Sequence, residues 1–411
     1  MYAFSFLVVA CVAAVAATDC NPPYPGTIAN IQVGSRPFWL VDQMEDSTLK
    51  TELMACSEKP IHNASFFSIS HRGGPLEFPE HSCEGLYMGA RMGAGVLECD
   101  VAFTSDLQLV CRHSQCDLHT TTDILLRPEL AAKCTLPFKP ATTHTNATAR
   151  CCTSDITHEE FLSLCAKMDS SNPNAATPEE YQYGGPNWRT ALYDNCATTI
   201  DHKTYINITN NLGLQFTPEL KTPEVVMPFR GKYTQQMYAQ QLINEYKEAG
   251  ISPERVWPQS FLISDILYWI KAQPSFGKQA DYLDPLVNTQ MGYQVAVKSM
   301  SKLYKQGVRV IAPPIFALLN TTEGEIIPSS YATAAKKVGM TIITWSLERS
   351  GPLKQAAAEG EYYISTIADA IKGDGDMYRI VDALARKVGV KAIFSDWPAT
   401  VTYYANCLGL E

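Results

Sequence analysis

From residue 65 to the C-terminus, short segments typical of buried β-strands alternate with longer segments typical of amphipathic helices. Repeated strand-then-helix units favour a parallel sheet covered by helices, and at this length we expect the sheet to close as an α/β TIM (β/α)8 barrel. Fewer than eight strands are clear, so an incomplete or distorted barrel stays open. The predicted strands span 65–70, 96–103, 107–112, 212–221, 255–261, 308–311, 340–345 and 390–395, and the predicted helices include 82–94, 233–248, 291–305 and 377–388.

The N-terminal residues predict export. Residues 1–17 carry no charge and are mostly apolar, with Val15 and Ala17 at the −3 and −1 positions of a small-residue cleavage site, as in a secretory signal peptide. A retained membrane anchor is the alternative, although the run is short for the ~20 residues of a span. Since no other segment approaches that length, we expect no stable membrane insertion. Residues 18–64 then form a lead-in segment with a helix over 40–55, and 65–411 form the barrel domain.

Residues 114–211 interrupt the barrel pattern. This segment is polar and rich in Thr, Asn and Pro, and a structureless loop of its length is uncommon inside a compact domain. We therefore expect a cysteine-rich inserted lobe over the mouth of the site. Its Tyr181, Tyr183 and Trp188 either line a substrate pocket or pack within the lobe. Six cysteines lie in it: Cys116, Cys134, Cys151, Cys152, Cys165 and Cys196.

Cysteine and asparagine patterns point to the secretory pathway. Of the 13 cysteines, Cys11 leaves with the predicted signal peptide, and the even number that remains contains no Cys-x-x-Cys pair. This usage is typical of disulfides formed in an oxidising compartment, and Cys20 with Cys56 is a plausible pair because they bracket the lead-in helix. Asn-x-Ser/Thr sequons predict N-glycans on a secreted chain, at Asn63, Asn146, Asn207 and Asn320.

Ionisable residues gather between residues 68 and 113. Glu98 and Asp100 lie two residues apart on a predicted strand, so their side chains point to the same face. Two inward carboxylates repel each other and lose solvation unless a cation lies between them, and Ca²⁺ and Mg²⁺ bind carboxylate oxygens in this way. His71 and His113 follow predicted strands and, near such an ion, suit general acid and base roles. Each residue alone is commonplace; only the joint pattern predicts a site.

The same residues resemble the signature of the glycerophosphodiester phosphodiesterase family, relatives of the phosphatidylinositol phospholipase C barrels. The matching motifs are His71-Arg72-Gly73, Pro79-Glu80, Glu98 through Asp106, and Leu109 to His113. Two positions depart from the family pattern. His81 replaces the usual Asn, and we expect it to alter substrate contacts. Ser114 replaces the usual Asp, which removes an orienting partner of His113.

The resemblance implies further site residues. Glu219, in the family's Glu-x-Lys motif, completes the metal site, and Lys221 faces phosphate together with Arg72. Trp345 corresponds to a residue that packs against the glycerol part of the substrate, unless it is simply a core aromatic. Asp396 resembles a terminal Asp-x-Pro turn and is interpreted as structural. These positions lie near predicted strand ends, where TIM-barrel active sites are built.

The expected function is a secreted, metal-dependent hydrolase that cleaves glycerophosphodiesters to glycerol phosphate and an alcohol. One Ca²⁺ or Mg²⁺ held by Glu98, Asp100 and Glu219 is the implied cofactor, and His71 and His113 share the proton transfers. A net charge of −9 without a basic block argues against nucleic acid as a partner. A small-molecule phosphodiester is the partner that the resemblance implies. Two alternatives stay open: a secreted glycoside hydrolase using paired carboxylates, and a catalytically inactive barrel that acts as a binding protein.

Overall fold

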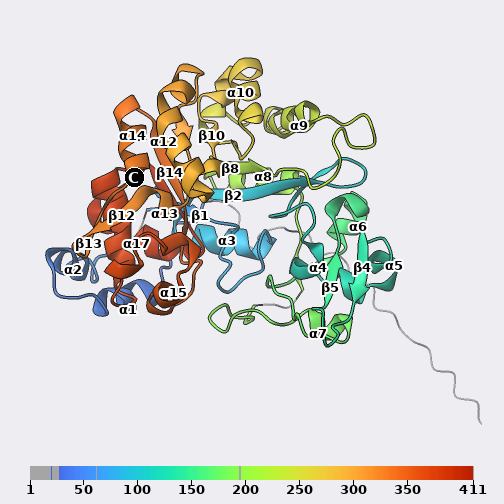
Figure 1. Cartoon of the computed structure of the whole chain (residues 1–411), viewed down its shortest axis with the longest axis horizontal. Coiled ribbons are helices and arrows are strands. Elements are labelled where there is room, and N and C mark those ends of the chain that lie inside the picture. The colour runs from blue at the N-terminus through green and yellow to red at the C-terminus, as the bar shows by residue number, and fades with distance from the viewer. Residues whose placement is uncertain (1–19, 21–26, 62, 194–195, 411) are drawn as a thin grey trace, which may run out of the picture.

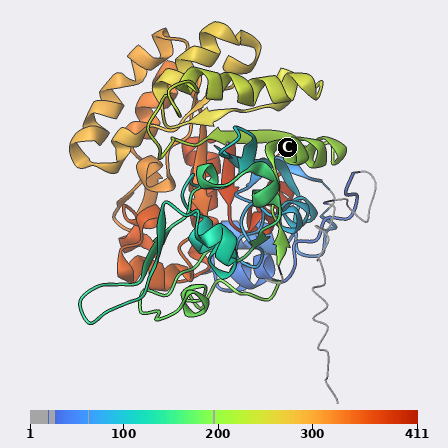
Figure 2. The same ribbon diagram turned by 90° about the vertical axis from the view of Figure 1, so that its right-hand side faces the viewer.

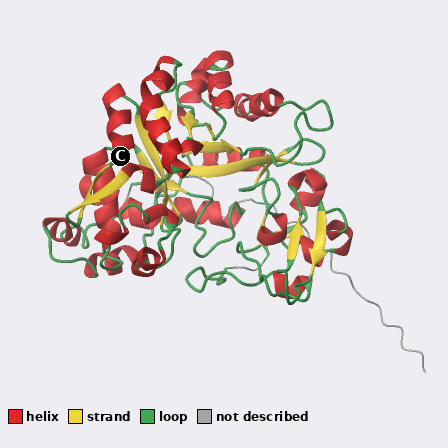
Figure 3. Cartoon of the chain, in the orientation of Figure 1, coloured by secondary structure: helices red, strands yellow, loops and turns green. Residues whose placement is uncertain are grey.

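The computed structural model describes residues 20, 27–61, 63–193 and 196–410. Its centre is a closed barrel of parallel strands with helices around the outside, so the predicted TIM barrel is confirmed (Figures 1 and 3). The ring closes because β1 pairs with both β2 and β15. In order around the barrel, the strands are β1 (Ser65–Ser70), β2 (Ala94–Phe103), β8 (Gln215–Leu220), β9 (Gln259–Ser260), β10 (Asp281–Tyr282), β11 (Val310–Ile311), β14 (Thr341–Leu347) and β15 (Ala392–Ser395).

Short strands explain why the sequence shows fewer than eight clear ones. β9, β10 and β11 are two residues long, and so short a strand has no periodicity to detect. β10 was not predicted at all, because it begins with the buried acid Asp281 where an apolar residue is expected. Of the predicted strand over 255–261, only the two residues of β9 form a strand. The predicted strand is shorter at its start because a 3₁₀ turn occupies Pro253–Arg255.

Helices pack on the outside of the barrel and form the main hydrophobic core against its strands. α3 begins after Ser82, whose hydroxyl accepts a hydrogen bond from the Gly85 N–H at 3.0 Å. It ends at Arg91 and not at the predicted residue 94, because Gly93 takes φ +88° and turns the chain into β2. The longer helices are α3 (Cys83–Arg91), α8 (His202–Asn211), α9 (Gln235–Glu248), α10 (Ile263–Ala272), α12 (Gln290–Lys305), α14 (Ser330–Val338), α16 (Asp376–Asp382) and α17 (Pro398–Leu408).

Shorter elements complete the barrel layer. A π-helical segment, Ala383–Val388, continues α16. After β11 and one short helix, strands β12 and β13 pair in an antiparallel hairpin. The remaining bounds in this part of the chain are α11 (Pro274–Gly277), α13 (Ile315–Leu318), β12 (Leu319–Thr322), β13 (Glu325–Pro328) and α15 (Leu353–Glu359).

The lead-in segment corrects two predictions. The single helix expected over 40–55 is two helices, α1 (Arg36–Asp42) and α2 (Thr48–Met54), because the Ser47 side chain caps a new helix. The expected Cys20–Cys56 disulfide is wrong: the bonds are Cys20–Cys83 and Cys56–Cys407. α2 packs on α17, and this contact brings Cys56 next to Cys407. Residues 1–17, the predicted signal peptide, lie outside the described residues, and among those described no helix could span a membrane.

Between β3 and α8 the chain leaves the barrel and forms a separate group of small elements. β3 (Leu109–Cys111) runs antiparallel to β2, and two small antiparallel pairs, β4–β5 and β6–β7, follow. This group has its own apolar cluster and lies beside the barrel in Figure 1 and in front of it in Figure 2. Three disulfides join cysteines within it: Cys116–Cys152, Cys134–Cys151 and Cys165–Cys196. Its elements are α4 (Leu118–Thr121), α5 (Pro128–Ala131), β4 (Leu136–Lys139), β5 (Thr148–Arg150), α6 (His158–Leu162), β6 (Cys165–Ala166), α7 (Pro178–Tyr181) and β7 (Ala197–Thr198).

Candidate active site

Three acidic side chains meet on neighbouring barrel strands. Glu98 and Asp100 lie on one face of β2, and the parallel pairing of β2 with β8 places Asp100 directly beside Glu219. One carboxylate oxygen from each of the three lies within 4.8 Å of the others, and all three residues are buried. The pair predicted from strand alternation and the third acid implied by resemblance are thus brought together. We call these three residues the carboxylate cluster.

Burial and charge set the protonation of this cluster. Burial, reinforced by Asp100, raises the pKa of Glu98 well above its usual range, and burial raises the pKa of Glu219 to about 7. Burial alone would raise the pKa of Asp100, but Lys221 and His81 hold it well below its usual range. Asp100 Oδ1 is buried without a hydrogen-bond partner among the described residues. Crowded, buried carboxylate oxygens of this kind fit a hard divalent cation such as Ca²⁺ or Mg²⁺.

Two partners at Nδ1 fix the orientation of the His71 ring. Its Nδ1 lies 2.5 Å from Oδ1 of Asp396 and 2.9 Å from Oγ of Ser346. Its Nε2 lies 4.0 Å from Oε2 of Glu98, on the side of the carboxylate cluster. A carboxylate at Nδ1 fixes the tautomer that carries its proton there and leaves Nε2 free to exchange a proton. Burial, together with Arg72, lowers the pKa of His71 to about 4, so the ring is neutral near pH 7.

His113 reaches the site on a hairpin and not at the end of a barrel strand. It follows β3, which the Cys99–Cys111 disulfide ties to β2. Burial lowers the pKa of His113 well below its usual range, and the nearby Arg72 lowers it further. The hydroxyl of the neighbouring Ser114 donates a hydrogen bond to Oε1 of Glu224.

His81, the other departure from the family motif, contacts the carboxylate cluster. Its Nε2 lies 2.8 Å from Oδ2 of Asp100, and its side chain is 1% exposed. It adopts φ +53°, a left-handed conformation that Asn adopts more readily than most residues. The structure therefore places His81 against a carboxylate of the cluster, and an effect of this departure on substrate contacts stays a prediction.

Arg72 and Lys221 bring positive charge to the same cluster. The Arg72 backbone N–H donates to Oε2 of Glu98 at 2.8 Å, and its Nε lies 3.5 Å from Oδ2 of Asp100. Lys221 Nζ lies 2.7 Å from Oε1 of Glu219 and 3.8 Å from Oδ1 of Asp100. Both cations lie where an anionic ligand above the carboxylates would meet them.

A pocket of about 40 Å³ opens over the cluster. One part of its wall is apolar and includes Trp345, whose Nε1–H donates to the Ala312 carbonyl at 2.7 Å and so fixes the indole. The pocket lining as a whole contains every predicted site residue except Asp100. The lining residues are His71, Arg72, Glu98, His113, Glu219, Lys221, Gln259, Phe261, Leu283, Trp345 and Phe394.

Comparison with known families accounts for this combination of barrel and pocket. Residues 71–400 match the sequence profile of the glycerophosphoryl diester phosphodiesterase family. The chain belongs to this family. The match confirms the resemblance read from the motifs and the enzyme class expected from it, a glycerophosphodiester phosphodiesterase.

Two relatives and one solved structure are similar to this phosphodiesterase. An "Extracellular protein" of Arthroderma benhamiae is 53% identical over 245 residues, which cover 59% of this chain and 100% of the relative. A glycerophosphodiester phosphodiesterase of Arabidopsis thaliana is 29% identical over 83 residues, 20% of this chain and 22% of the relative. A crystal structure from Silicibacter pomeroyi, described as a glycerophosphoryl diester phosphodiesterase, shares the fold with a TM-score of 0.54 at 14% identity, covering 85% of this chain and 95% of that one.

Sequence reasoning missed several groups that support the phosphodiesterase pocket. Gln259 Nε2 donates to Oε1 of Glu98 at 3.2 Å, and Ser346 contacts His71. Asp396, interpreted from the sequence as a structural turn residue, is the direct partner of His71 Nδ1. The available signal was their position at the carboxyl ends of barrel strands, where this fold builds its sites.

Two buried carboxylates and three arginines form an ion-pair network behind His71. Arg349 lies 3.0 Å from Oε1 of Glu80 and 2.9 Å from Oδ2 of Asp396, and Arg72 Nη1 lies 2.9 Å from Oε2 of Glu80. Arg189 Nη2 lies 3.4 Å from Oδ2 of Asp396. Burial alone would raise both carboxyl pKa values, but the arginines hold that of Glu80 well below its usual range, and with His71 they lower that of Asp396 to about 2.

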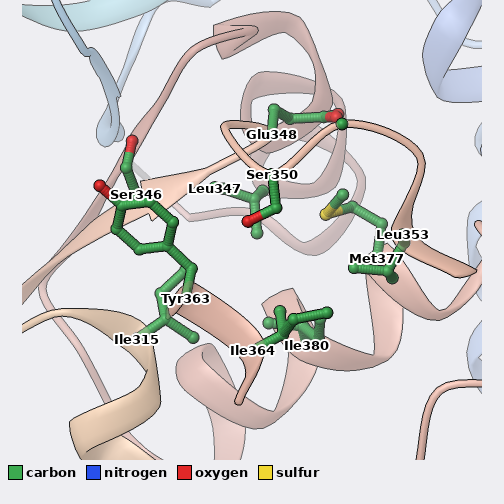
Figure 4. Close-up of a pocket in the computed structure, with 11 residues that line it drawn as sticks. Ile315, Ser346, Leu347, Glu348, Ser350, Leu353, Tyr363, Ile364, Met377 and Ile380 are labelled. Carbon is green, nitrogen blue, oxygen red and sulfur yellow. The ribbon is translucent and has the colours of Figure 1, made fainter. Parts of the chain in front are cut away.

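A second, smaller cavity lies beneath the loop that carries Arg349. Its volume is about 10 Å³, which is the room that one water needs. Figure 4 shows Ser346 and Tyr363 at one end, and Glu348, Ser350 and apolar side chains around the rest. This cavity is therefore a small gap in the packing next to Ser346, which contacts His71, and it is too small for a substrate. The apolar side chains are Ile315, Leu347, Leu353, Ile364, Met377 and Ile380.

Proposed function

We propose that this phosphodiesterase hydrolyses glycerophosphodiesters to glycerol phosphate and an alcohol, with one Ca²⁺ or Mg²⁺ held by Glu98, Asp100 and Glu219. One observation carries the proposal: one oxygen from each of three buried carboxylates lies within 4.8 Å of the other two, and two of these residues, Glu98 and Glu219, line a pocket with two imidazoles. When bound, such a cation stabilises negative charge on a phosphate oxygen and lowers the pKa of a bound hydroxyl.

The chain's own residues supply the remaining chemistry. Arg72 and Lys221 bind the phosphate oxygens and offset their charge. His71, with its proton held on Nδ1 by Asp396, accepts or returns a proton at Nε2. His113 takes the opposite proton transfer, so that one imidazole activates the nucleophile and the other protonates the leaving alcohol.

Trp345 forms the apolar side of the proposed glycerol site. Its fixed indole faces the pocket beside Phe261, with ring centroids 6.0 Å apart. A flat aromatic surface suits the C–H face of a glycerol unit, whereas the charged half of the pocket suits its phosphate. The pocket thus separates the two ends of a glycerophosphodiester by polarity.

We also propose that the protein is secreted and N-glycosylated, with residues 1–17 as signal peptide and 18–64 as lead-in. Six disulfides among the described residues, and a relative named an extracellular protein, support an oxidising compartment. The glycan sites are exposed in the fold: Asn63, Asn146, Asn207 and Asn320. Residues 114–211 are proposed as a lobe inserted into the 65–411 barrel domain.

The test is to assay the purified protein against a panel of glycerophosphodiesters and, in parallel, a panel of glycans. The proposal expects glycerol phosphate from at least one phosphodiester and no glycan cleavage. Glycan cleavage alone would support a glycoside hydrolase. A phosphodiester that binds and is protected from cleavage would support an inactive binding protein.

A further inference from the structure

One segment of the lobe, residues 186–193, contacts the rim of the barrel. We call it the strap. The Thr190 backbone N–H donates to the Leu76 carbonyl at 2.9 Å. Trp188 packs so closely on Gly351 that a Cβ added there would lie 2.6 Å from the indole. The disulfide Cys165–Cys196 ties the chain to the lobe just after the strap. The strap is therefore fixed both to the barrel and to the lobe.

The strap delivers a buried cation to the ion-pair network. The Arg189 side chain is only 8% exposed, its Nη2 lies 3.4 Å from Oδ2 of Asp396, and its Nη1 lies 3.9 Å from Oε1 of Glu80. Burying a guanidinium is costly unless carboxylates compensate for its lost hydration. These two carboxylates provide that compensation, so they specify where Arg189 lies.

Resting on the proposed function, we infer that Arg189 is a positioning residue for the reaction: it fixes Asp396, and through Asp396 it orients His71. Asp396 offers Oδ1 to His71 Nδ1 and Oδ2 to Arg189, so the carboxylate is held at both oxygens. Rotation of this carboxylate would release the imidazole. The inserted lobe thereby contributes to acid–base catalysis and is more than a cover over the pocket.

The effect of Arg189 should be moderate and confined to turnover. Arg349 contacts the same Oδ2 atom at 2.9 Å, closer than Arg189 does, so loss of Arg189 leaves Asp396 partly held. Arg189 does not contribute to the wall of the substrate pocket. Outer partners of this kind typically change activity by 10–100-fold, and we expect roughly 10-fold here.

The experiment measures kcat and KM of the full chain on a glycerophosphodiester for Arg189→Ala and Arg189→Lys, each in the wild-type and the Asp396→Asn background. Arg189→Ala should lower kcat roughly 10-fold at unchanged KM, and Arg189→Lys should recover part of the loss. In the Asp396→Asn background, Arg189→Ala should change nothing further. Lys133→Ala is the control, because Lys133 is a 43% exposed cation of the same lobe that pairs with Glu160.

Three results would overturn the inference: wild-type kcat in Arg189→Ala, a raised KM at unchanged kcat, or the same fold-loss with and without Asp396. Should Arg189→Ala fail to fold, Arg189→Lys decides the question, because a kcat equal to that of the wild type would contradict the inference and a loss that depends on Asp396 would support it. If the wild-type chain itself cleaves no glycerophosphodiester, the proposed function fails and not this inference alone.

Discussion

At the scale of single residues, two histidines beside the carboxylate cluster have different partners. His71 is supported by Asp396 and turns Nε2 toward the carboxylate cluster, whereas His81 donates to Asp100 within that cluster. His71 is thus placed to move a proton, and His81 is placed to orient a metal ligand. Substitution of His71 should therefore lower turnover, whereas substitution of His81 should weaken cation binding.

His71→Ala should lower kcat by roughly 10²–10⁴-fold while divalent-cation affinity persists, because it removes an acid–base group and no carboxylate. His81→Ala should instead weaken cation affinity by roughly 10–100-fold, because Asp100 loses its orienting partner. Calorimetric titration with Mg²⁺ or Ca²⁺ and steady-state kinetics check both, and each variant is the control for the other. Unchanged turnover in His71→Ala, or unchanged affinity in His81→Ala, would contradict the assignment concerned.

Asp396 should make stability depend on pH in acid. Its pKa falls from 3.8 to about 2 in the folded protein, so its ionised form stabilises the fold at pH values above 3.8. This contribution, about 2 kcal/mol for such a shift, is lost as the pH falls through about 2. The free energy of unfolding of Asp396→Asn should therefore approach that of the wild type between pH 5 and about pH 2. Urea denaturation measures it, and a difference that stays constant with pH would refute the prediction.

At the scale of elements, the β2–β3 hairpin places His113. The Cys99–Cys111 disulfide fixes this hairpin across a separation of 12 residues. The Cys134–Cys151 disulfide, inside the lobe, spans a comparable 17 residues, and neither of its cysteines lines the pocket. The two bonds form a matched pair for separating placement of His113 from general stability.

Replacing either pair by Ala should destabilise the fold by a similar amount, about 3 kcal/mol on the loop-closure argument. Only Cys99→Ala with Cys111→Ala should also lower kcat in the protein that remains folded, because only that bond fixes β3. Denaturation and kinetics on both double variants check this. Equal kcat in the two variants would mean that the hairpin holds His113 without its disulfide.

The sequence predicted the long strands well, because a buried run or an alternating pattern of six or more residues marks β1, β2 and β14. It could not predict β10, whose two residues include a buried acid. Nor could it give the partner of Cys56, since Cys407 lies 351 residues away and is brought near only by tertiary packing. Short strands and distant contacts are set by the closed barrel and not by local pattern.

The site residues, too, were predicted from the sequence only in part. Strand alternation alone put Glu98 and Asp100 on one face, whereas Glu219 and Lys221 were identified only by their likeness to a family motif. The role of Asp396 was missed, because a turn motif at a strand end shows its location and not its partner. No sequence feature indicated Arg189, because a residue of the lobe reaches the barrel only through the folded strap.

At the scale of the whole molecule, the protein combines one closed barrel, a carboxylate cluster on two of its strands, and a lobe that contacts its rim. The fold brings three buried acids together, at a cost in repulsion and lost hydration that a bound divalent cation would offset. The central claim is that phosphodiester cleavage depends on such a cation.

Phosphorus NMR of a glycerophosphodiester incubated with the EDTA-treated protein, before and after Mg²⁺ or Ca²⁺ is restored, tests this claim most directly. The account predicts that the diester resonance persists in excess EDTA and gives way to glycerol phosphate once the cation returns, with no such recovery in Glu219→Gln. Full cleavage in excess EDTA, or a Glu219→Gln variant as active as the wild type, would contradict it.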